Sequence, residues 1–211
     1  MICEVVHTEQ QNLFEDTPEE IENLLPKDGE VLVRFGFFSK AESEQYLHTL
    51  INTITWKQDK MSFGVKEVNL PRLTAWYGEL DKDYSYSGIH NKGNEWTAEL
   101  LQIKQRVEEH AGIQFNSVLL NYYRDGNDSV SWHRDQEKVL KVNPIIASVS
   151  FGATRTFKFR HVDDHKLIRA VSLTSGTYLL MRGETQHKWQ HHIPKEPQLK
   201  KPRVNLTFRI L

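Results

Sequence analysis

The sequence predicts an α+β fold in which two helices precede a sandwich or jelly roll of short strands. The first observation is the helical spacing of apolar residues in two segments before residue 112. The second is a run of short segments after it, each rich in β-branched or aromatic residues and separated from the next by turn residues. Many short strands at close spacing are typical of sandwiches and barrels. We expect the helices to cover one of the sheets.

Two segments have the marks of amphipathic helices. The first begins at a capping box, in which the side chains of Ser39 and Glu42 satisfy free N–H groups of the first turn. The second is expected to run from about Asn94 to a stop at Gly112, because glycine readily adopts the left-handed conformation that ends many helices. The apolar faces are Tyr46, Leu47, Leu50, Ile51 and Ile54 in the first helix, and Trp96, Leu100, Ile103 and Val107 in the second.

The second half of the chain reads as a series of strands with no internal repeat. Alternation of apolar and polar residues, or a short apolar run between turn residues, marks each strand. The predicted strands are 118–123, 144–151, 156–161, 167–173, 177–181, 187–193 and 204–210.

Charge divides the 211 residues into an acidic leader and a basic remainder. Residues 1–30 carry nine acids against Lys27 alone, a net charge of −8, while residues 31–211 carry +7, which together give the overall −1. Phosphate binding requires positive charge, although +7 is also ordinary for a protein surface. We expect residues 1–30 to be a mobile or loosely packed extension and residues 31–211 to be a single domain.

Composition limits the class of protein. The single cysteine, Cys3, excludes a disulfide framework and a cysteine-built zinc site, so a reducing compartment, cytoplasm or nucleus, is expected. The longest apolar runs are shorter than the ~18 residues of a membrane span, and the amino terminus lacks a signal peptide's basic and apolar regions. We therefore expect an intracellular protein with no membrane partner, and a monomer as the default state.

The last strand carries two arginines on one face. With a period of two, Arg203, Asn205, Thr207 and Arg209 share that face, while apolar residues occupy the other. The two arginine Cα atoms would lie ~20 Å apart at strand rise, so their long side chains could hold a short dicarboxylate between them. Arginine suits this role because its planar fork binds carboxylate bidentately and stays charged.

A second candidate site is His133-Arg134-Asp135. In extended chain the imidazole and the carboxylate point to the same side. One more histidine would complete the facial triad of two histidines and a carboxylate that binds Fe(II) in non-haem oxygenases.

Several residues compete for a place in that triad. The third ligand is expected near the terminal strand, where His191 and His192 would face opposite ways in a strand. His187 stands four residues before His191, a spacing that suits a helical metal site, but Trp189 and the following Pro194 argue against a helix there. A second His-x-Asp motif, His161 with Asp163, follows an alternating strand and precedes a charged turn.

The sum of these motifs resembles an AlkB-type nucleic-acid dealkylating dioxygenase, and most closely the branch that includes the animal DNA-repair homologues. The resemblance covers about residues 71–211. It rests on Pro71-Arg72 with Tyr77-Gly78, Asn121-x-Tyr123-x-Asp125-Gly126, His133-Arg134-Asp135, residues 146–153 with Arg155, Phe157-x-Phe159-Arg160-His161, residues 189–194 and residues 202–209.

The resemblance implies a double-stranded β-helix (jelly-roll) core over about residues 116–211, with helices on one sheet and a nucleotide-recognition lid at about residues 57–93. It implies that His133, Asp135 and His191 bind Fe(II) and that O₂ and 2-oxoglutarate are the cosubstrates. The residues implied to bind 2-oxoglutarate are Asn121, Tyr123, Arg203, Asn205 and Arg209, with Arg203 on the distal carboxylate and Arg209 near the end that binds iron. His192 is a departure, because the family often has a small residue there.

Four further residues are candidates for reading the substrate. By the resemblance, Tyr86 would sandwich a flipped base against His133, with Tyr84 on the same side of the segment, and Phe63 would fill the gap left in a duplex. Glu137 would accept a hydrogen bond from an exocyclic amine of the base. The alternative reading is that these aromatic residues anchor loops. Gln136 departs from near relatives, which have an aspartate there.

The function implied is direct repair of DNA by oxidative demethylation of 1-methyladenine and 3-methylcytosine, with release of formaldehyde. The methyl group is hydroxylated, and the unstable product loses formaldehyde to restore the base. Two other functions remain open at this stage. One is the same chemistry on RNA or on a protein side chain, and the other is a non-catalytic nucleic-acid reader. Loss of a metal ligand or of an arginine would mark such a reader, and none of these residues is missing.

Overall fold

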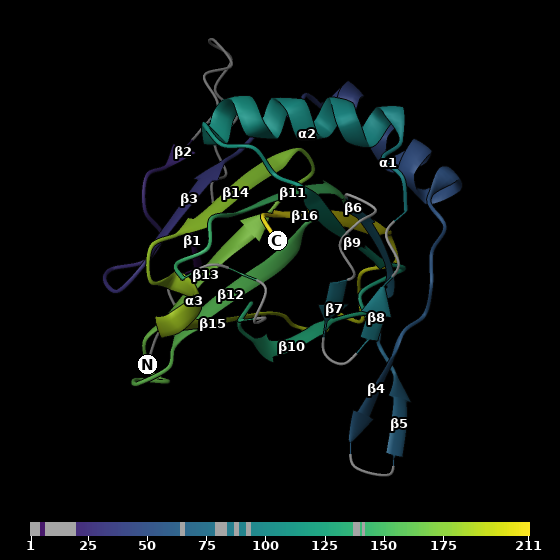
Figure 1. Ribbon diagram of the computed structural model, residues 1–211. Helices are drawn as coiled ribbons and strands as arrows, with labels where there is room; N and C mark the ends of the chain where they lie inside the picture. Colours follow the sequence, from purple (N-terminus) through teal and green to yellow (C-terminus); the bar gives the residue numbers. More distant parts are fainter. Residues whose placement is uncertain are drawn as a thin grey trace.

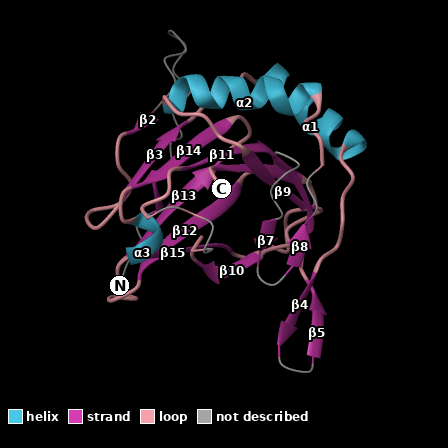
Figure 2. Cartoon of the chain, viewed as in Figure 1, coloured by secondary structure: helices cyan, strands magenta, loops and turns pink. Residues whose placement is uncertain are grey.

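The computed structural model describes residues 5–6, 20–63, 66–78, 84–86, 89–91, 94–136, 140 and 142–211. Its two main layers are β-sheets that face each other, and two helices cover the outer face of the larger sheet (Figures 1 and 2). Among the strand pairs in the described residues, only β1 with β13 is parallel. This is the predicted jelly-roll arrangement, and the α+β class is confirmed.

The larger sheet has seven strands and the smaller has five. The larger is ordered β2 (Glu20–Ile21), β3 (Glu30–Arg34), β14 (Thr177–Arg182), β11 (Ile146–Gly152), β16 (Arg203–Arg209), β9 (Ser117–Tyr123) and β6 (Leu73–Gly78). The smaller is ordered β1 (Val5–Val6), β13 (Ile168–Leu173), β12 (Arg155–His161), β15 (Trp189–Ile193) and β10 (Val130–His133). Two hairpins, β4 (Lys60–Phe63) with β5 (Lys66–Asn69) and β7 (Tyr84–Tyr86) with β8 (Ile89–Asn91), lie outside these sheets.

The helices form where the capping residues predict them. In α1 (Lys40–Thr53) the Ser39 and Glu42 capping box is present in full. Helix α2 (Ala98–Ala111) ends at Gly112 in the left-handed conformation, but it begins later than predicted. Asn94 is held instead by hydrogen bonds to the backbone of Trp76, so the helix starts after Thr97, whose side chain accepts from the N–H of Leu100. None of the helices in the described ranges is long and apolar enough to cross a membrane.

Two apolar cores follow from the alternation along the strands. In β16 the side chains of Val204, Leu206 and Phe208 join the core beneath α1 and α2. The intervening residues of the strand point between the two sheets, as the period of two requires. A second core between the sheets contains Val33, Phe159 and other apolar side chains.

Part of the predicted amino-terminal extension is corrected by the structure. In its described portion, strand β2 pairs with β3, and the side chains of Leu24 and Leu25 are buried in the second core. The ring N–H of Trp189 donates to the carbonyl of Lys27 at 3.1 Å. Residues 20–30 therefore pack against the sheets, because their few apolar side chains are buried even though the segment is acidic.

Two other expectations also differ from the structure. Within the predicted lid at 57–93, Leu73–Gly78 is the edge strand β6 of the larger sheet, paired with β9. The predicted strand 187–193 begins only at Trp189, because residues 185–188 form the short helix α3 (Thr185–Lys188), which includes His187.

The tightest backbone approach predicts a large loss of stability for Gly126→Ala. A Cβ at Gly126 would lie 1.7 Å from the carbonyl oxygen of Glu196, so one of the two segments must move. We expect the free energy of unfolding to fall by about 3 kcal/mol in urea titrations. The control is Gly183→Ala, where nothing lies within 4 Å and the φ of +61° alone should cost about 1 kcal/mol. Equal losses in the two variants would contradict the packing argument.

Candidate functional site

Polar side chains gather where the inner faces of the two sheets meet. A cavity of about 60 Å³, here called the inner pocket, is lined by residues from β9, β11 and β16 on one side and from β10 and β15 on the other. A cleft of about 470 Å³, here called the outer cleft, lies between the β4–β5 segment and β10. Arg72 and His133 line both, so the two spaces meet at these side chains.

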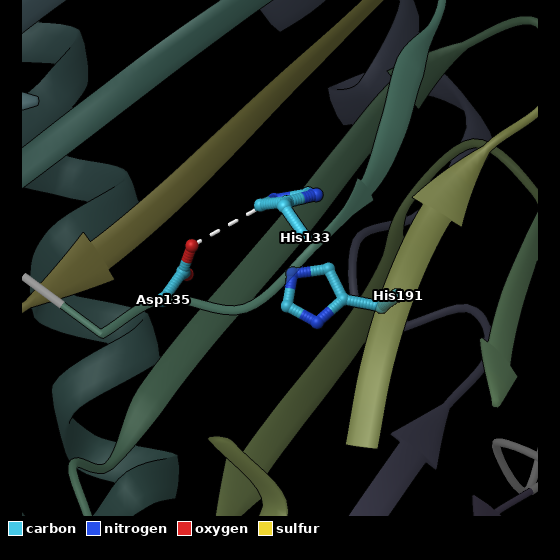
Figure 3. Close-up of side chains that lie close together, drawn as sticks. All are labelled: His133, Asp135 and His191. Atoms are coloured by element: carbon cyan, nitrogen blue, oxygen red, sulfur yellow. Dashed lines mark ion pairs between the residues drawn. The ribbon is translucent and has the colours of Figure 1, made fainter. Parts of the chain in front are cut away.

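His133, Asp135 and His191 come together at this junction. Figure 3 shows their side chains converging from two separate segments of the chain. One potential ligand atom from each lies within 4.8 Å of the others, and this is the only such cluster of His, Cys, Asp or Glu among the described residues. The pairing of β10 with β15 places His133 opposite His191, with ring centroids 4.3 Å apart. Strand register thus brings two distant histidines to one point.

Hydrogen bonding prepares His133 to bind a metal through Nε2. Its Nδ1 lies 2.9 Å from the carbonyl oxygen of Ser131, which can only accept, so Nδ1 carries the proton and donates. Nε2 therefore presents a lone pair, 3.7 Å from Oδ1 of Asp135. Burial lowers the pKa of His133, even though the charge of Asp135 opposes this effect. A neutral imidazole is the form that binds metals.

Asp135 is held as a carboxylate by its surroundings. Burial is the largest single influence and would raise its pKa, but the charge of Arg209, the two neighbouring histidines and the hydrogen bond from Arg209 together outweigh burial and keep the pKa below its usual range. Nη2 of Arg209 donates to Oδ2 at 2.7 Å, while the other oxygen, Oδ1, has no hydrogen-bond partner among the described residues. The backbone N–H of Asp135 donates to Oε1 of Gln186 at 3.0 Å. One carboxylate oxygen is thus oriented and the other is available to a cation.

The buried His191 predicts a pH dependence of stability in the metal-free protein. Burial, followed by the charge of His133, lowers the pKa of His191 to about 3. The unfolded chain takes up a proton near pH 6.5 while the folded protein does not, so stability is lost as the pH falls below 6.5. We expect this group to contribute about 1.4 kcal/mol per pH unit in urea titrations between about pH 6 and pH 4. His191→Gln should flatten the slope by that amount, and an unchanged slope would refute the prediction.

Arg203 fits the role of an anion-binding side chain. It is 2% exposed, and its Nη2 donates to Oγ of Ser150 at 2.8 Å. Its Nε and Nη1 are buried without a hydrogen-bond partner among the described residues. The guanidinium carbon lies 5.0 Å from the ring centre of Tyr123, and burial lowers the pKa of Arg203. A buried cation with unsatisfied donors is costly, and a carboxylate in the inner pocket would satisfy it.

Asn121 and Asn205 line the same pocket with different freedom. Oδ1 of Asn121 accepts from Nε of Arg72 at 2.8 Å, which leaves its amide N–H groups to face the pocket. Asn205 is more fully used within the sheet, since its Nδ2 donates to Oγ of Ser148 at 2.6 Å and its Oδ1 accepts from Thr207. Asn205 therefore stabilises the wall of the inner pocket through hydrogen bonds within the sheet, while the N–H groups of Asn121 can donate to an anion.

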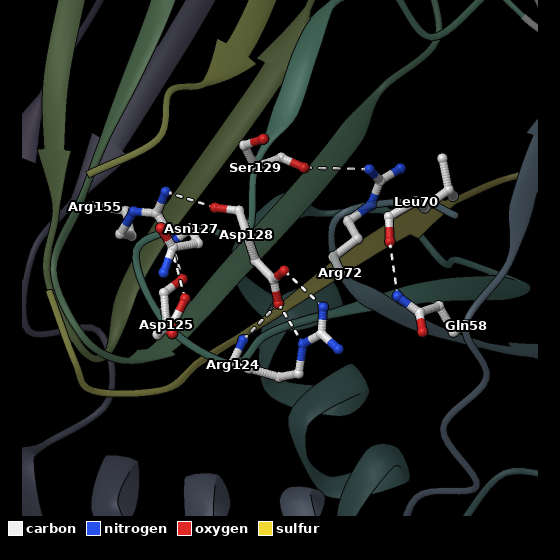
Figure 4. A network of polar contacts seen from close by, with 9 residues as sticks. All are labelled: Gln58, Leu70, Arg72, Arg124, Asp125, Asn127, Asp128, Ser129 and Arg155. Carbon is white, nitrogen blue, oxygen red and sulfur yellow. Dashed lines mark hydrogen bonds and ion pairs between the residues drawn. The ribbon is translucent and has the colours of Figure 1, made fainter. Parts of the chain in front are cut away.

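A polar network holds the loop that leads from β9 to β10. Figure 4 shows Arg124 bonded to Asp128 and, beside it, Arg155 bonded to the carbonyl of Asp128. The Arg124 pair is bidentate at 2.8 Å, and Arg72 donates to the carbonyl of Ser129 at 3.3 Å. These bonds hold the loop that leads into β10, the strand that carries His133.

The competing histidines lie elsewhere. Nε2 of His161 is 3.1 Å from Asp28, and its Nδ1 accepts from the backbone of Asp163, so both ring nitrogens are used structurally. His192 points to the outer face of the smaller sheet, where its ring stacks on Trp132. His187 lies in α3, and its carbonyl accepts from Arg134. The short helix there was not predicted, yet it does not place His187 in the cluster.

The structure leaves the four substrate-reading residues as predictions. Phe63 ends β4, and Tyr84 and Tyr86 lie in β7, but the side chains of these three fall outside the described part of the chain, as does all of Glu137.

Two residues that contribute to the site were not identified as such from the sequence. Arg72, which belongs to the Pro71-Arg72 motif, orients Asn121, and Gln186 in α3 holds the backbone of Asp135. The motif was the available signal for Arg72. The sequence around Gln186 carries no signal of its role, because that role depends on a contact between segments far apart in the chain.

Comparison with known proteins agrees with this geometry. Residues 30–209 match the 2OG-Fe(II) oxygenase superfamily. The chain is 45% identical to alpha-ketoglutarate-dependent dioxygenase alkB homolog 3 of Mus musculus, over 82% of this chain and 63% of that protein. It is 37% identical to DNA oxidative demethylase ALKBH2 of the same species, over 82% of this chain and 76% of that protein. The chain thus spans less than two thirds of the alkB homolog 3 relatives it matches.

A solved structure shows the same fold. The structure of OsALKBH1 superposes with a TM-score of 0.61 at 16% identity, covering 86% of this chain and 96% of that one. At this identity the likeness concerns the fold alone. Together with the family match and the sequence relatives, it shows that the chain belongs to the 2OG-Fe(II) oxygenase superfamily and is of the AlkB type.

Proposed function

We propose that this protein is an iron(II)- and 2-oxoglutarate-dependent dioxygenase that removes N-methyl groups from bases in DNA, with 1-methyladenine and 3-methylcytosine as substrates. One observation carries the proposal. The His133, Asp135 and His191 cluster lies where an inner pocket with arginines meets an outer cleft open to solvent. A cosubstrate and a larger substrate can therefore approach the same metal from two sides.

The residues fit Fe(II) by their chemistry. Two neutral imidazoles and one carboxylate are the ligand set of the facial triad, which leaves positions open for cosubstrate and oxygen. The unpartnered Oδ1 of Asp135 and the lone pair of His133 Nε2 supply two ligand atoms, and the third comes from His191. Iron bound by these residues would supply the O₂ chemistry in which one oxygen atom goes to 2-oxoglutarate, which becomes succinate and CO₂, and the other hydroxylates a methyl group.

The inner pocket is suited to a dicarboxylate. Arg203 lies at one end of the face of β16 and presents unsatisfied donors. Arg209 lies at the other end, beside Asp135, and Asn121 faces the space from β9. Two arginines at the two ends of one strand select an anion with a carboxylate at each end, which 2-oxoglutarate is. In this binding mode Arg203 holds the distal carboxylate.

The outer cleft is suited to a nucleobase. Its volume of about 470 Å³ falls within the range of small-molecule sites, and His133 and Trp132 are among the residues that line it. Met61 and Val68 of the β4–β5 hairpin line the opposite side. A base taken out of its stack needs such apolar and aromatic walls in place of its former neighbours. Tyr86, Tyr84, Phe63 and Glu137 remain the residues that the family resemblance predicts to read the base.

The names of the relatives support the substrate class. ALKBH2 of Mus musculus is named a DNA oxidative demethylase, and it is 37% identical to this chain. The net charge of +7 over residues 31–211 favours a polyanion as partner. DNA is the favoured substrate, and RNA is the alternative that the same experiment tests.

Mass spectrometry of methylated oligonucleotides tests the proposal. DNA strands with one 1-methyladenine or 3-methylcytosine, single or duplex, and matched RNA strands are incubated with protein, iron(II), 2-oxoglutarate and ascorbate. We expect DNA to lose one methylene mass only when both cofactors are present, with formaldehyde released in equal amount. Demethylation of RNA alone would replace the DNA substrate. Turnover of 2-oxoglutarate with every oligonucleotide left methylated would refute a nucleic-acid substrate.

A further inference from the structure

We propose that Trp132 and His192 act as positioning residues that clamp the two candidate iron histidines from the opposite face of the smaller sheet. Each of them is the chain neighbour of one candidate ligand: Trp132 precedes His133 and His192 follows His191. The inference rests on the proposed iron site, and it concerns side chains that point away from that site.

The backbone pairing of β10 with β15 is irregular in the segment that leads to His133. Within the described part of the chain, β10 is the edge strand of the smaller sheet and pairs only with β15. Its register contains the pairs Val130 with Ile193 and His133 with His191, and the register shifts between them. An irregular edge ladder bends and twists a strand more readily than a regular one. The separation of His133 and His191 is therefore poorly determined by the backbone alone.

Hydrogen bonds from Arg134 to the carbonyl of His187 and from the N–H of Asp135 to Gln186 join the chain after β10 to the chain before β15, but neither involves an imidazole ring. The Nδ1 bond of His133 is to Ser131 in its own strand, so it orients the ring without tying β10 to β15. Nδ1 of His191 has no hydrogen-bond partner among the described residues. The two rings meet edge to face at 67° across a 4.3 Å centroid separation. Two imidazoles in this arrangement need an outside contact that holds the strands in register.

The outer face supplies that contact. The rings of Trp132 and His192 stack at 3.8 Å between centroids and 22° between planes. The guanidinium carbon of Arg160 lies 4.4 Å from the ring centre of Trp132, and its Nε donates to Gln190 at 2.8 Å. Arg160 belongs to β12 and Gln190 to β15, so Trp132 of the edge strand is held against the next two strands of the sheet.

Alternation of side chains makes the clamp act on the ligands. Because successive residues point to opposite faces of a strand, a stack between positions 132 and 192 fixes the relative height of positions 133 and 191. The ring stack that links β10 to β15 thus lies one residue away from each imidazole, on the opposite face of the sheet. His192 is the residue of β15 that supplies the stacking ring.

Cobalt(II) binding tests the clamp without relying on catalysis. Metal-free protein is titrated with cobalt(II), a spectroscopically visible substitute for iron(II), and both affinity and absorption spectrum are recorded. We expect Trp132→Ala and His192→Ala each to weaken binding by about tenfold and to alter the spectrum, as loss of an outer-shell support does. The double variant should bind no more weakly than either single variant, because both remove the same contact. Trp132→Phe, which keeps a ring, should restore most of the affinity.

A matched aromatic pair elsewhere serves as the control. Trp56 packs on Tyr122 at 5.2 Å and lies away from the metal cluster, so Trp56→Ala should leave the affinity for cobalt(II) unchanged. If wild-type protein binds cobalt(II) and the variants at 132 and 192 bind equally well, the clamp is overturned while the metal site stands. If wild-type protein binds no metal and His133→Ala behaves identically, the proposed metal site fails and the clamp fails with it.

Discussion

Asp135→Asn is expected to abolish the proposed dealkylation and to weaken iron(II) binding by at least about 100-fold. The carboxylate is the only anionic group in the cluster, and in a buried site its charge offsets that of a divalent cation. Asparagine has the same shape but no charge, so the fold should persist while the metal is lost. Iron binding is measured by competition with a chelator of known affinity, and activity is measured by release of formaldehyde.

The second His-x-Asp motif provides the matched control. The side chain of Asp163 is 69% exposed and forms a surface ion pair with Lys188 at 3.5 Å. Surface pairs of this kind contribute little to stability, so Asp163→Asn should leave iron binding and activity unchanged. Retained iron binding in Asp135→Asn, or lost binding in Asp163→Asn, would contradict the assignment of the metal site.

Arg203→Met is expected to raise the KM for 2-oxoglutarate by about 100-fold, with a smaller effect on kcat at saturating cosubstrate. The variant removes a charge-assisted bond to the distal carboxylate, which lies far from the reacting end. Thermal stability should stay the same or rise, because burial disfavours the charge of Arg203 in the absence of a bound anion. The measurement is steady-state consumption of 2-oxoglutarate over a range of concentrations.

Two further variants sharpen this test. Arg203→Lys keeps the charge but loses the planar fork, and we expect it to recover only part of the affinity. Arg182→Gln removes a guanidinium that is 45% exposed and paired with Glu30, so it should not change the KM. A KM that is unaffected in Arg203→Met would show that the distal carboxylate binds elsewhere in the inner pocket.

Several parts of the structure could be predicted because they depend on local pattern. The capping box of Ser39 and Glu42 and the stop at Gly112 were both found where the sequence places them. The two faces of β16 were also predicted, and the structure divides them between the helix-covered core and the inner pocket. These features follow from the direction in which successive side chains point along a single helix or strand. Residues that are close in the sequence determine that direction.

Other parts depend on contacts that no local pattern contains. Leu24 and Leu25 lie in an acidic segment, so the sequence pattern did not predict their burial. Only their contacts with the second core show that this segment packs against the sheets. The start of α2 moved from Asn94 to Ala98 because Trp76, on another strand, holds Asn94. The roles of Arg72 and Gln186 likewise exist only between segments that meet in space.

The sequence by itself determined which residues were available for the site: two arginines on one face of β16, and His133 with Asp135 on one side of an extended segment. Only the tertiary structure decided which histidine joins them. The pairing of β10 with β15 puts His191 opposite His133, and the alternation of the strand sends His192 to the outer face. Register between two strands is a long-range property, and a shift of one residue would exchange the two histidines.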